Sequence, residues 1–483
     1  MILADQSLVL RYIVPFSFRT DYDDLFQCMS AASEWTLCPQ PAKKAVVFSH
    51  LYQSTFGDGG SNSMGSAWEF AHVNKLPQFI YADCSENFPG QWRVCHTQIH
   101  LFRTGIGLVW YEIEPLNWQG GLALDDLIQM QNRFKDCSYT KNSFSIKHRR
   151  RSKTEADSFS PFDVAVWLGE LLNPLGDFHY MSGSCLKNGK KCPDKALIFN
   201  YVLLQQQKAI ADQQLQKIAF WLANGYTQNY RPSPQALAEC IHPFEDVSLY
   251  ASRSGCGYYA AVNEGNHAFF TGNFNDSIRK DYFILYLLVL YQSFSLMHFS
   301  HICSMEFPSD PKLYNESVEI GAQLDALVLE LNTFLMKGMH SSVSSVQHHN
   351  DFYNYLTTRL MIREDIESIK IGTDALVEIQ HARQERAEAK LQEAANEAEK
   401  QRDRRQNIAL AVLSLFSLFA VFQDIHALYW NIISLKPAEI LQKICSGSWQ
   451  LLGEVITYAM VVFISICCVT ALLSSFLPRR KKK

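Results

Sequence analysis

The 483-residue chain lacks the residue patterns of an enzyme or of a zinc site. Its 13 cysteines are scattered without the paired spacing of zinc ligands, and Cys185 and Cys192, around a lysine-rich turn, come nearest to a pair. No nucleophile–base motif, metal-ligand triad or dinucleotide fingerprint is present. We therefore expect no enzymatic activity, no cofactor, and cysteines that stay reduced in a cytoplasmic environment.

A strong charge of one sign is also absent. The chain carries 44 Lys and Arg against 48 Asp and Glu, a net charge of −4, so direct binding to nucleic acid is not expected. Met1–Val14 contains Asp5 and Arg11 and lacks a small-residue cleavage site, so no signal peptide is expected there. A composition of 47% hydrophobic and 19% charged residues fits one soluble domain plus a membrane element.

Two uncharged stretches, Asn407–Gln423 and Val455–Leu477, lie close to the C-terminus. A helix needs roughly 20 apolar residues to cross a bilayer core, and Lys and Arg favour the cytoplasmic side. The basic residues beside them are Arg402, Arg404 and Arg405 before the first stretch and residues 479–483 after the second. The simplest topology is a hairpin in the inner (plasma) membrane, with both termini and a large N-terminal body in the cytoplasm.

The first 280 residues have the pattern of a cytoplasmic α/β domain. Strands are predicted over Ser7–Phe16 and Lys44–Ser49, and a hairpin over Thr97–Arg103 and Leu108–Glu114. Glycine in the turn Thr104–Gly107 allows the positive φ of a tight hairpin. Helices are predicted over Ala123–Phe134, Phe162–Leu172 and Ile198–Asn224, and further strands over Val247–Arg253, Gly257–Asn263 and His267–Thr271.

From residue 281 onward the pattern is almost wholly helical. Tyr282–Met305 carries no charge and has the length of a third span. Gln292, His298 and His301 would be expensive in lipid, and a third span would move the arginines before residue 407 to the side opposite the body. We therefore predict a buried helix there, followed by an amphipathic helix over Glu316–Lys337.

The last soluble stretch, Asp351–Arg405, contains no proline. A seam typical of a coiled coil runs along it at spacings of three and four, through Ala387, Leu391, Ala394 and Ala398. A continuous helix from Asp374 to Asp424 would be about 76 Å long at roughly 1.5 Å per residue. The chain is thus divided into a cytoplasmic α/β domain (1–280), a cytoplasmic helical region (281–373), a stalk helix (374–405), a first transmembrane helix (406–430), an outer loop (431–450), a second transmembrane helix (451–478) and a basic cytoplasmic tail (479–483).

One polar stripe runs through the first predicted span. Its members follow one another at steps of three or four and fall within a sector of about 120°. They are Asn407, Leu410, Ser414, Ser417, Val421, Asp424, Leu428 and Asn431. Asp424 lies inside the aromatic boundary set by Tyr429 and Trp430. A carboxylate at that depth must face protein or water, because exposure to lipid costs several kcal/mol.

Two arrangements would keep the polar side chains of this stripe away from lipid. If identical helices surround a common axis, Asp424 forms an acidic ring that serves as a cation site. The lining of such a pore would be Asn407, Ser414, Ser417, Val421, Asp424 and Asn431. Alternatively, the stripe packs against the second span, with the two serines hydrogen-bonded between helices and Asp424 extended toward the interface. The cost of a carboxylate facing lipid favours the pore.

The chain resembles the CorA-like divalent-cation transport proteins. The resemblance rests mainly on its architecture, an α/β body, a long stalk helix and a two-span hairpin ending in Arg and Lys, and more weakly on Leu101–Gly107, Ser252–Gly255 and Asp281–Gln292. It covers essentially the whole chain. It implies an α+β cytoplasmic domain, a pore-lining first span, a homo-oligomer (a pentamer) in membrane lipid, and a divalent cation such as Mg²⁺ as the transported or regulatory ion.

The sequence departs from that family at the outer end of the first span. The family's Gly-Met-Asn signature is replaced by Tyr429-Trp430-Asn431, so only Asn431 carries over and magnesium selectivity is not implied. Some divergent CorA-like proteins look like membrane effectors of CRISPR-type antiviral defence opened by a nucleotide messenger, which is the alternative function. A further alternative is a membrane-anchored scaffold without conductance.

Other local features have simpler structural explanations. The basic run Lys147–Lys153 would suit an anionic ligand and so favour the messenger hypothesis, but an exposed charged linker explains it as well. Gly57–Ser61 lacks the lysine of a phosphate loop and indicates a turn. The pair Cys95 and His96 is expected to be structural, as are the histidines of the buried helix.

Overall fold

The computed structural model describes residues 8–392 except 39–46, 82–89, 117–122, 138–143, 149–157, 188, 206–211, 228, 306 and 308–317, together with Gln423, Ile456 and Phe463. The chain forms two compact units, Met1–Gln384 and Glu385–Lys483. The first unit is an α+β body with a mixed sheet, followed by a helical region that contains one long apolar helix.

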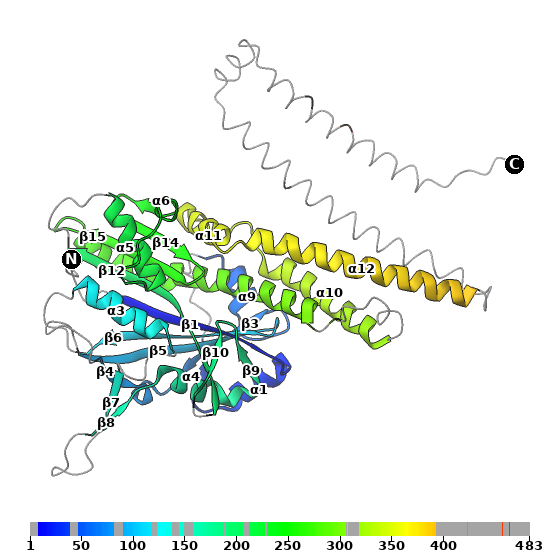
Figure 1. Ribbon diagram of the computed structural model, residues 1–483, viewed down its shortest axis with the longest axis horizontal. Helices are drawn as coiled ribbons and strands as arrows, with labels where there is room; N and C mark the ends of the chain where they lie inside the picture. Colours follow the sequence, from blue (N-terminus) through cyan, green and yellow to red (C-terminus); the bar gives the residue numbers. More distant parts are fainter. Residues whose placement is uncertain are drawn as a thin grey trace. The chain divides into compact units, whose positions relative to one another are not determined.

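Thirteen strands of the described residues form one mixed sheet (Figure 1). Ten of them follow in the order β13 (Ile241–Phe244), β14 (Val247–Ser252), β15 (Gly255–Val262), β12 (Leu197–Gln205), β1 (Val9–Phe18), β6 (Ile106–Pro115), β5 (Gln91–Phe102), β4 (Gln78–Tyr81), β7 (Phe144–His148) and β8 (Ser158–Pro161). Off this path, β3 (Gly65–Phe70) pairs with β5 and with β2 (Trp35–Leu37), and β9 (Phe178–Tyr180) pairs with β1. The β12–β15 pair is parallel, with Tyr201 opposite Tyr258, whereas β1 is antiparallel to both of its long neighbours.

Alternation along the strands divides the apolar side chains between two cores. On β1, Leu10, Tyr12 and Val14 join one core, whereas Val9 and Ile13 join the other. The first core is covered by α1 (Tyr22–Ala31), α3 (Leu124–Lys135), α4 (Val164–Leu172) and α5 (Asp212–Asn224). The second is covered by α2 (Ser49–Phe56), α7 (His267–Thr271), α8 (Asn273–Ser277), α9 (Phe283–Met305), α10 (Val318–Gly338) and α11 (Gln347–Arg359). Both faces of the sheet are therefore buried.

Smaller elements complete the body. They are α6 (Pro234–Ala238), the 3₁₀ turns Val73–Lys75 and Asn173–Leu175, a separate hairpin of β10 (Ser184–Lys187) and β11 (Lys190–Pro193), and a π-helical turn over Ile278–Tyr282. The π turn leads directly into α9. Such turns are rare and often mark functional positions.

Helix α9 is the buried helix that the sequence predicts over Tyr282–Met305. In the described residues, one helical stretch, His267–Met305, is long and apolar enough to cross a membrane, and 67% of its apolar window is buried inside the protein. Its Gln292 donates to the Gly338 carbonyl at 2.7 Å and to the Tyr353 hydroxyl at 2.9 Å. These polar contacts within the protein interior are those of a core helix.

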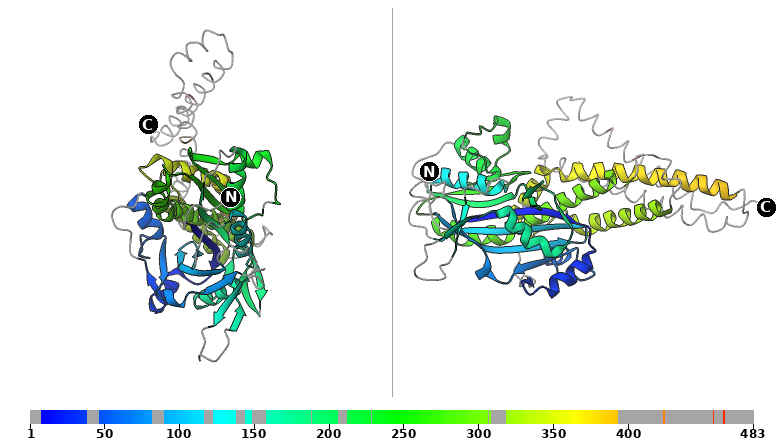
Figure 2. Two further views of the ribbon diagram at one scale, coloured as in Figure 1. Left: turned by 90° about the vertical axis from the view of Figure 1, so that its left-hand side faces the viewer. Right: turned by 60° about the horizontal axis from the view of Figure 1, so that its bottom comes forward.

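Helix α12 (Ile362–Gln392) begins upstream of Asp374, the predicted start of the stalk helix, and residues 393–405 of that prediction lie outside the described residues. Helices α10 and α12 extend beyond the edge of the sheet (Figure 2). The seam residues Ala387 and Leu391 lie on α12, whereas Ala394 and Ala398 lie outside the described residues.

Most predicted elements of the body are confirmed, and two are wrong. The hairpin β5–β6, the helices α3, α4 and α10 and the strands β14 and β15 lie where the sequence predicts them. The helix predicted over Ile198–Asn224 is instead strand β12 followed by α5, and the strand predicted over His267–Thr271 is helix α7. Of the strand predicted over Lys44–Ser49, residues 44–46 lie outside the described residues, Val47 forms an isolated bridge, and Ser49 begins helix α2. Of the linker predicted over Lys147–Lys153, Lys147 and His148 belong to strand β7, and residues 149–153 lie outside the described residues.

Candidate functional site

The predicted pore-lining residues lie outside the described part of the chain. They are Asn407, Ser414, Ser417, Val421, Asp424 and Asn431. What the structure does describe is helix α12, which ends at Gln392, upstream of these residues in the sequence. We call the junction of α11, α12 and β14 the stalk root and treat it as the candidate site.

A backbone break separates α11 from α12 at the stalk root. Met361 has φ +58°, and among the described residues other than glycine it alone has a positive φ. Both of its neighbours are buried, Leu360 at 5% and Ile362 at 1% exposure, whereas Met361 is 45% exposed. A left-handed methionine is strained and persists only where the surroundings fix it. The burial of the two flanking side chains supplies that constraint.

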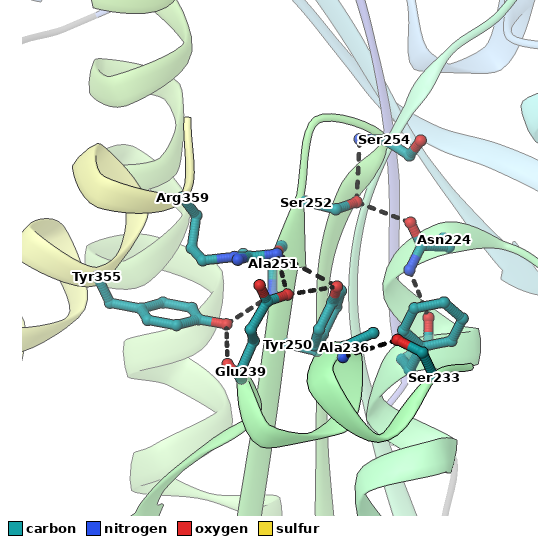
Figure 3. Close-up of polar contacts among 11 residues, drawn as sticks. Asn224, Ser233, Ala236, Glu239, Tyr250, Ala251, Ser252, Ser254, Tyr355 and Arg359 are labelled. Atoms are coloured by element: carbon teal, nitrogen blue, oxygen red, sulfur yellow. Dashed lines mark hydrogen bonds and ion pairs between the residues drawn. The ribbon is translucent and has the colours of Figure 1, made fainter. Parts of the chain in front are cut away.

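Arg359, the last residue of α11, binds the edge of the sheet (Figure 3). Its Nε donates to the Ala251 carbonyl at 3.0 Å, and its Nη2 donates to the Tyr250 hydroxyl at 3.2 Å. The same Nη2 lies 2.7 Å from Oε2 of Glu239, which follows α6. One guanidinium thus joins the start of the stalk to β14 and to α6.

Tyr355, one helical turn before Arg359, makes the second connection. Its hydroxyl donates to the Glu239 carbonyl at 2.9 Å and accepts from the Ala251 amide at 3.1 Å. Burial raises the pKa of this hydroxyl, so it remains a donor at neutral pH. Strand β13 begins at Ile241, which pairs with Leu249, so no β13 partner is recorded opposite Ala251. Two side chains of α11 therefore satisfy this stretch of the strand edge.

A serine-rich turn ties the opposite face of the sheet to the same strand. The Ser252 hydroxyl donates to Oδ1 of Asn224 at 2.8 Å and accepts from the Ser254 amide at 3.1 Å (Figure 3). A Cβ placed on Gly257 would lie 2.5 Å from the backbone nitrogen of Ala223, so α5 packs directly on the β15 backbone. Strand β14 is thereby held by α5 on one side and by α11 on the other.

A buried ion triad fixes the N-terminal end of α9. Glu112 on β6 accepts from Nε of Arg11 on β1 at 2.9 Å and pairs with Arg279 of the π turn. Arg11 also donates to the Arg279 carbonyl at 2.7 Å, and its guanidinium lies 4.2 Å from the Phe283 ring centroid. Burial alone would raise the pKa of Glu112, but the two guanidiniums outweigh it and hold that pKa below its usual value.

The glycine-rich turn, the Cys95–His96 pair and the Cys185–Cys192 pair of the sequence analysis each lie among contacts within the body. Gly59 lies in a turn and has a φ of +77°, and its carbonyl accepts a hydrogen bond from Arg103. His96 stacks near Trp110 and lies 3.0 Å from Glu69. Cys185 and Cys192 face each other across β10–β11. Within the described residues, no group of three or more His, Cys, Asp or Glu is arranged to hold a metal ion.

The sequence analysis missed the ion triad and the stalk root. Arg11 is the one charged residue of the apolar strand β1, and Glu112 lies between apolar residues of β6, so their positions could have identified them as paired. Arg359 and Glu239 are far apart in sequence and lie at the ends of short helices, where charged residues are ordinary.

Comparison of the chain with protein-family models, curated proteins and solved structures finds no match.

Proposed function

We propose that this chain is an oligomeric membrane channel or transporter for cations, with a CorA-like arrangement, whose cytoplasmic body controls conduction through the stalk helix. The observation that carries the proposal is the stalk root. Helix α12 starts directly after the strained residue Met361, and Arg359 and Tyr355 of the preceding helix bind strand β14 of the central sheet. In sequence the same helix leads toward the uncharged stretch Asn407–Gln423.

Conduction in this proposal depends on the polar stripe of the first span. Several copies gather so that Asp424 forms an acidic ring, which concentrates cations, and Ser414 and Ser417 replace part of the hydration shell. A movement of α11 against β14 changes the direction in which α12 leaves the body. Because α12 is continuous over 31 residues, a small rotation at its start becomes a large displacement at its far end.

A second candidate function is a defence effector of the same architecture, opened by a nucleotide messenger. It is favoured by a cleft in the body that carries several arginine and histidine side chains. The two candidates share the pore and differ in what opens it. A membrane-anchored scaffold, in contrast, would be a monomer without conductance.

Asp424→Asn tests the pore. We expect cation flux into liposomes to fall at least about tenfold, the effect of losing only ~1.4 kcal/mol of attraction for the ion. Asp424→Glu keeps the carboxylate and should retain flux, and both variants should assemble normally. Flux that is unchanged in Asp424→Asn would remove the pore assignment.

Ala394→Phe tests the oligomer. An axial coiled-coil seam of small residues has no room for an aromatic ring, so we expect the assembly to dissociate into smaller species. Native mass of the detergent-solubilised protein measures this directly, with the substitution Ala394→Ser as the control of similar size. An oligomer that survives the phenylalanine would place the seam elsewhere.

A further inference from the structure

A cleft of about 870 Å³ opens between the sheet and the helices α9 and α10. Its walls come from the end of β1, the β5–β6 turn, β9 and the two helices. Thr104 and Gly105 of the turn lie at its base with His298 of α9. The volume lies in the range of sites for ligands of nucleotide size.

Positively charged and imidazole groups outnumber the acids in this cleft. The titratable and charged groups that face it are Arg19, Asp21, Tyr22, Arg103, His179, His298, His301 and Glu330. Asp21 caps helix α1, and Arg103 pairs with Asp23 at 2.9 Å. Burial raises the pKa of Glu330, because partial removal from water disfavours the charged carboxylate. Arg19, Arg103 and three imidazoles thus line the cleft beside Asp21 and Glu330.

His298 is the buried member of this group. Its Nε2 lies 3.1 Å from the position of a Cβ on Gly105, so the ring packs against the β5–β6 turn. Burial, together with the positive neighbours His301 and Arg19, lowers the pKa of His298 to about 4. The imidazole is therefore neutral at physiological pH, mainly because it is partly removed from water.

We propose that this cleft binds an organic phosphate, with the phosphate against Arg19, His298 and His301 and the apolar part of the ligand against Phe18, Met64 and Leu329. Arginine and imidazole groups are natural partners of phosphate oxygens. The inference adds a regulatory ligand to the proposed channel. It does not depend on conduction, because binding is measurable without ion flux.

The cleft connects to the stalk root through packed side chains. The Thr104 hydroxyl lies 2.9 Å from that of Ser295 on α9. One turn earlier on α9, Gln292 is hydrogen-bonded to Tyr353 of α11, at 2.9 Å. A ligand that shifts α9 therefore acts on the helix that carries Tyr355 and Arg359, and so on the start of α12.

The test uses full-length protein in detergent and isothermal titration with ATP, inorganic pyrophosphate and uncharged adenosine. We expect ATP and pyrophosphate to bind and adenosine not to bind. Arg19→Gln and His298→Gln should each raise the Kd of ATP at least about tenfold. Arg93→Gln, at the far end of β5 from the turn, is the matched control and should leave the Kd unchanged. Arg19 is exposed, so its variant should fold normally.

The pH dependence gives a second measurement. A bound phosphate raises the pKa of His298, so ATP should bind more tightly at about pH 6 than at about pH 8, and His298→Gln should reduce that difference. Absence of ATP and pyrophosphate binding, or an Arg19→Gln variant with unchanged affinity, would overturn the assignment. The flux of Asp424→Asn tests only the pore, and ATP binding tests only the cleft. The failure of one proposal can therefore be distinguished from the failure of the other.

Discussion

Replacing Glu112 by glutamine is expected to lower the free energy of unfolding by about 3–5 kcal/mol, the range found when one partner of a buried ion pair is removed. Glu112 is 5% exposed and stands between two guanidiniums, those of Arg11 and Arg279. Glutamine keeps the shape but not the charge, so the buried Arg11 and the partly buried Arg279 would both lose their carboxylate partner. Thermal or urea unfolding of the full-length protein measures the loss.

Glu114→Gln is the matched control for this change. Glu114 lies on the same strand and also pairs with an arginine, Arg93, but its side chain is 39% exposed against 6% for Glu112. A solvent-exposed pair contributes only about 0–1 kcal/mol. Similar losses for the two variants would contradict the importance of burial for the triad.

Acid should remove the same stabilisation. The pKa of Glu112 is lower in the folded protein than in the unfolded chain, so its contribution is complete above the unfolded pKa of about 4.3. It is lost as the pH falls through the lower, folded pKa. The difference in stability between the wild type and Glu112→Gln should therefore shrink in acid, and a difference that grows would reverse the assigned sign.

The limits of the sequence prediction are clear at β12 and α7. All residues of Leu197–Leu204 are buried, because β12 lies in the middle of a sheet that is covered on both faces. A continuous apolar run of this kind carries no period that separates strand from helix. Helix α7 follows a turn in which the Asn263 carbonyl accepts a hydrogen bond from the His267 amide. The aromatic residues of His267–Thr271 favour a strand, and they do not reveal this bond.

The elements with a strong local signal were predicted correctly. The hairpin β5–β6 has a turn glycine, Gly105, whose φ of +74° favours that residue. The prediction that α9 is buried rests on the cost of its polar residues in lipid, and Gln292 finds partners within the protein in Gly338 and Tyr353. The stalk root had no such signal. Arg359 and Glu239 come together only after the sheet and the helices are assembled, so spacing along the chain cannot reveal the pair.

Arg359→Met is the change expected to affect the stalk root most. It removes the ion pair with Glu239 and the hydrogen bonds to the Ala251 carbonyl and the Tyr250 hydroxyl. Charge-assisted hydrogen bonds contribute about 1.5–3 kcal/mol, so local opening of the junction should increase roughly tenfold to a hundredfold. Amide hydrogen exchange in β14 and in the first turn of α12 measures this opening.

Arg363→Met supplies the control, because Arg363 lies one turn further along on α12 and is exposed. Methionine preserves the aliphatic length at both positions, so the comparison isolates the contact with the sheet. If the root transmits the state of the body to the pore, cation flux in liposomes changes in Arg359→Met and stays at the wild-type level in Arg363→Met. Faster exchange in β14 with unaltered flux would show that this junction holds the helix in place but does not control conduction.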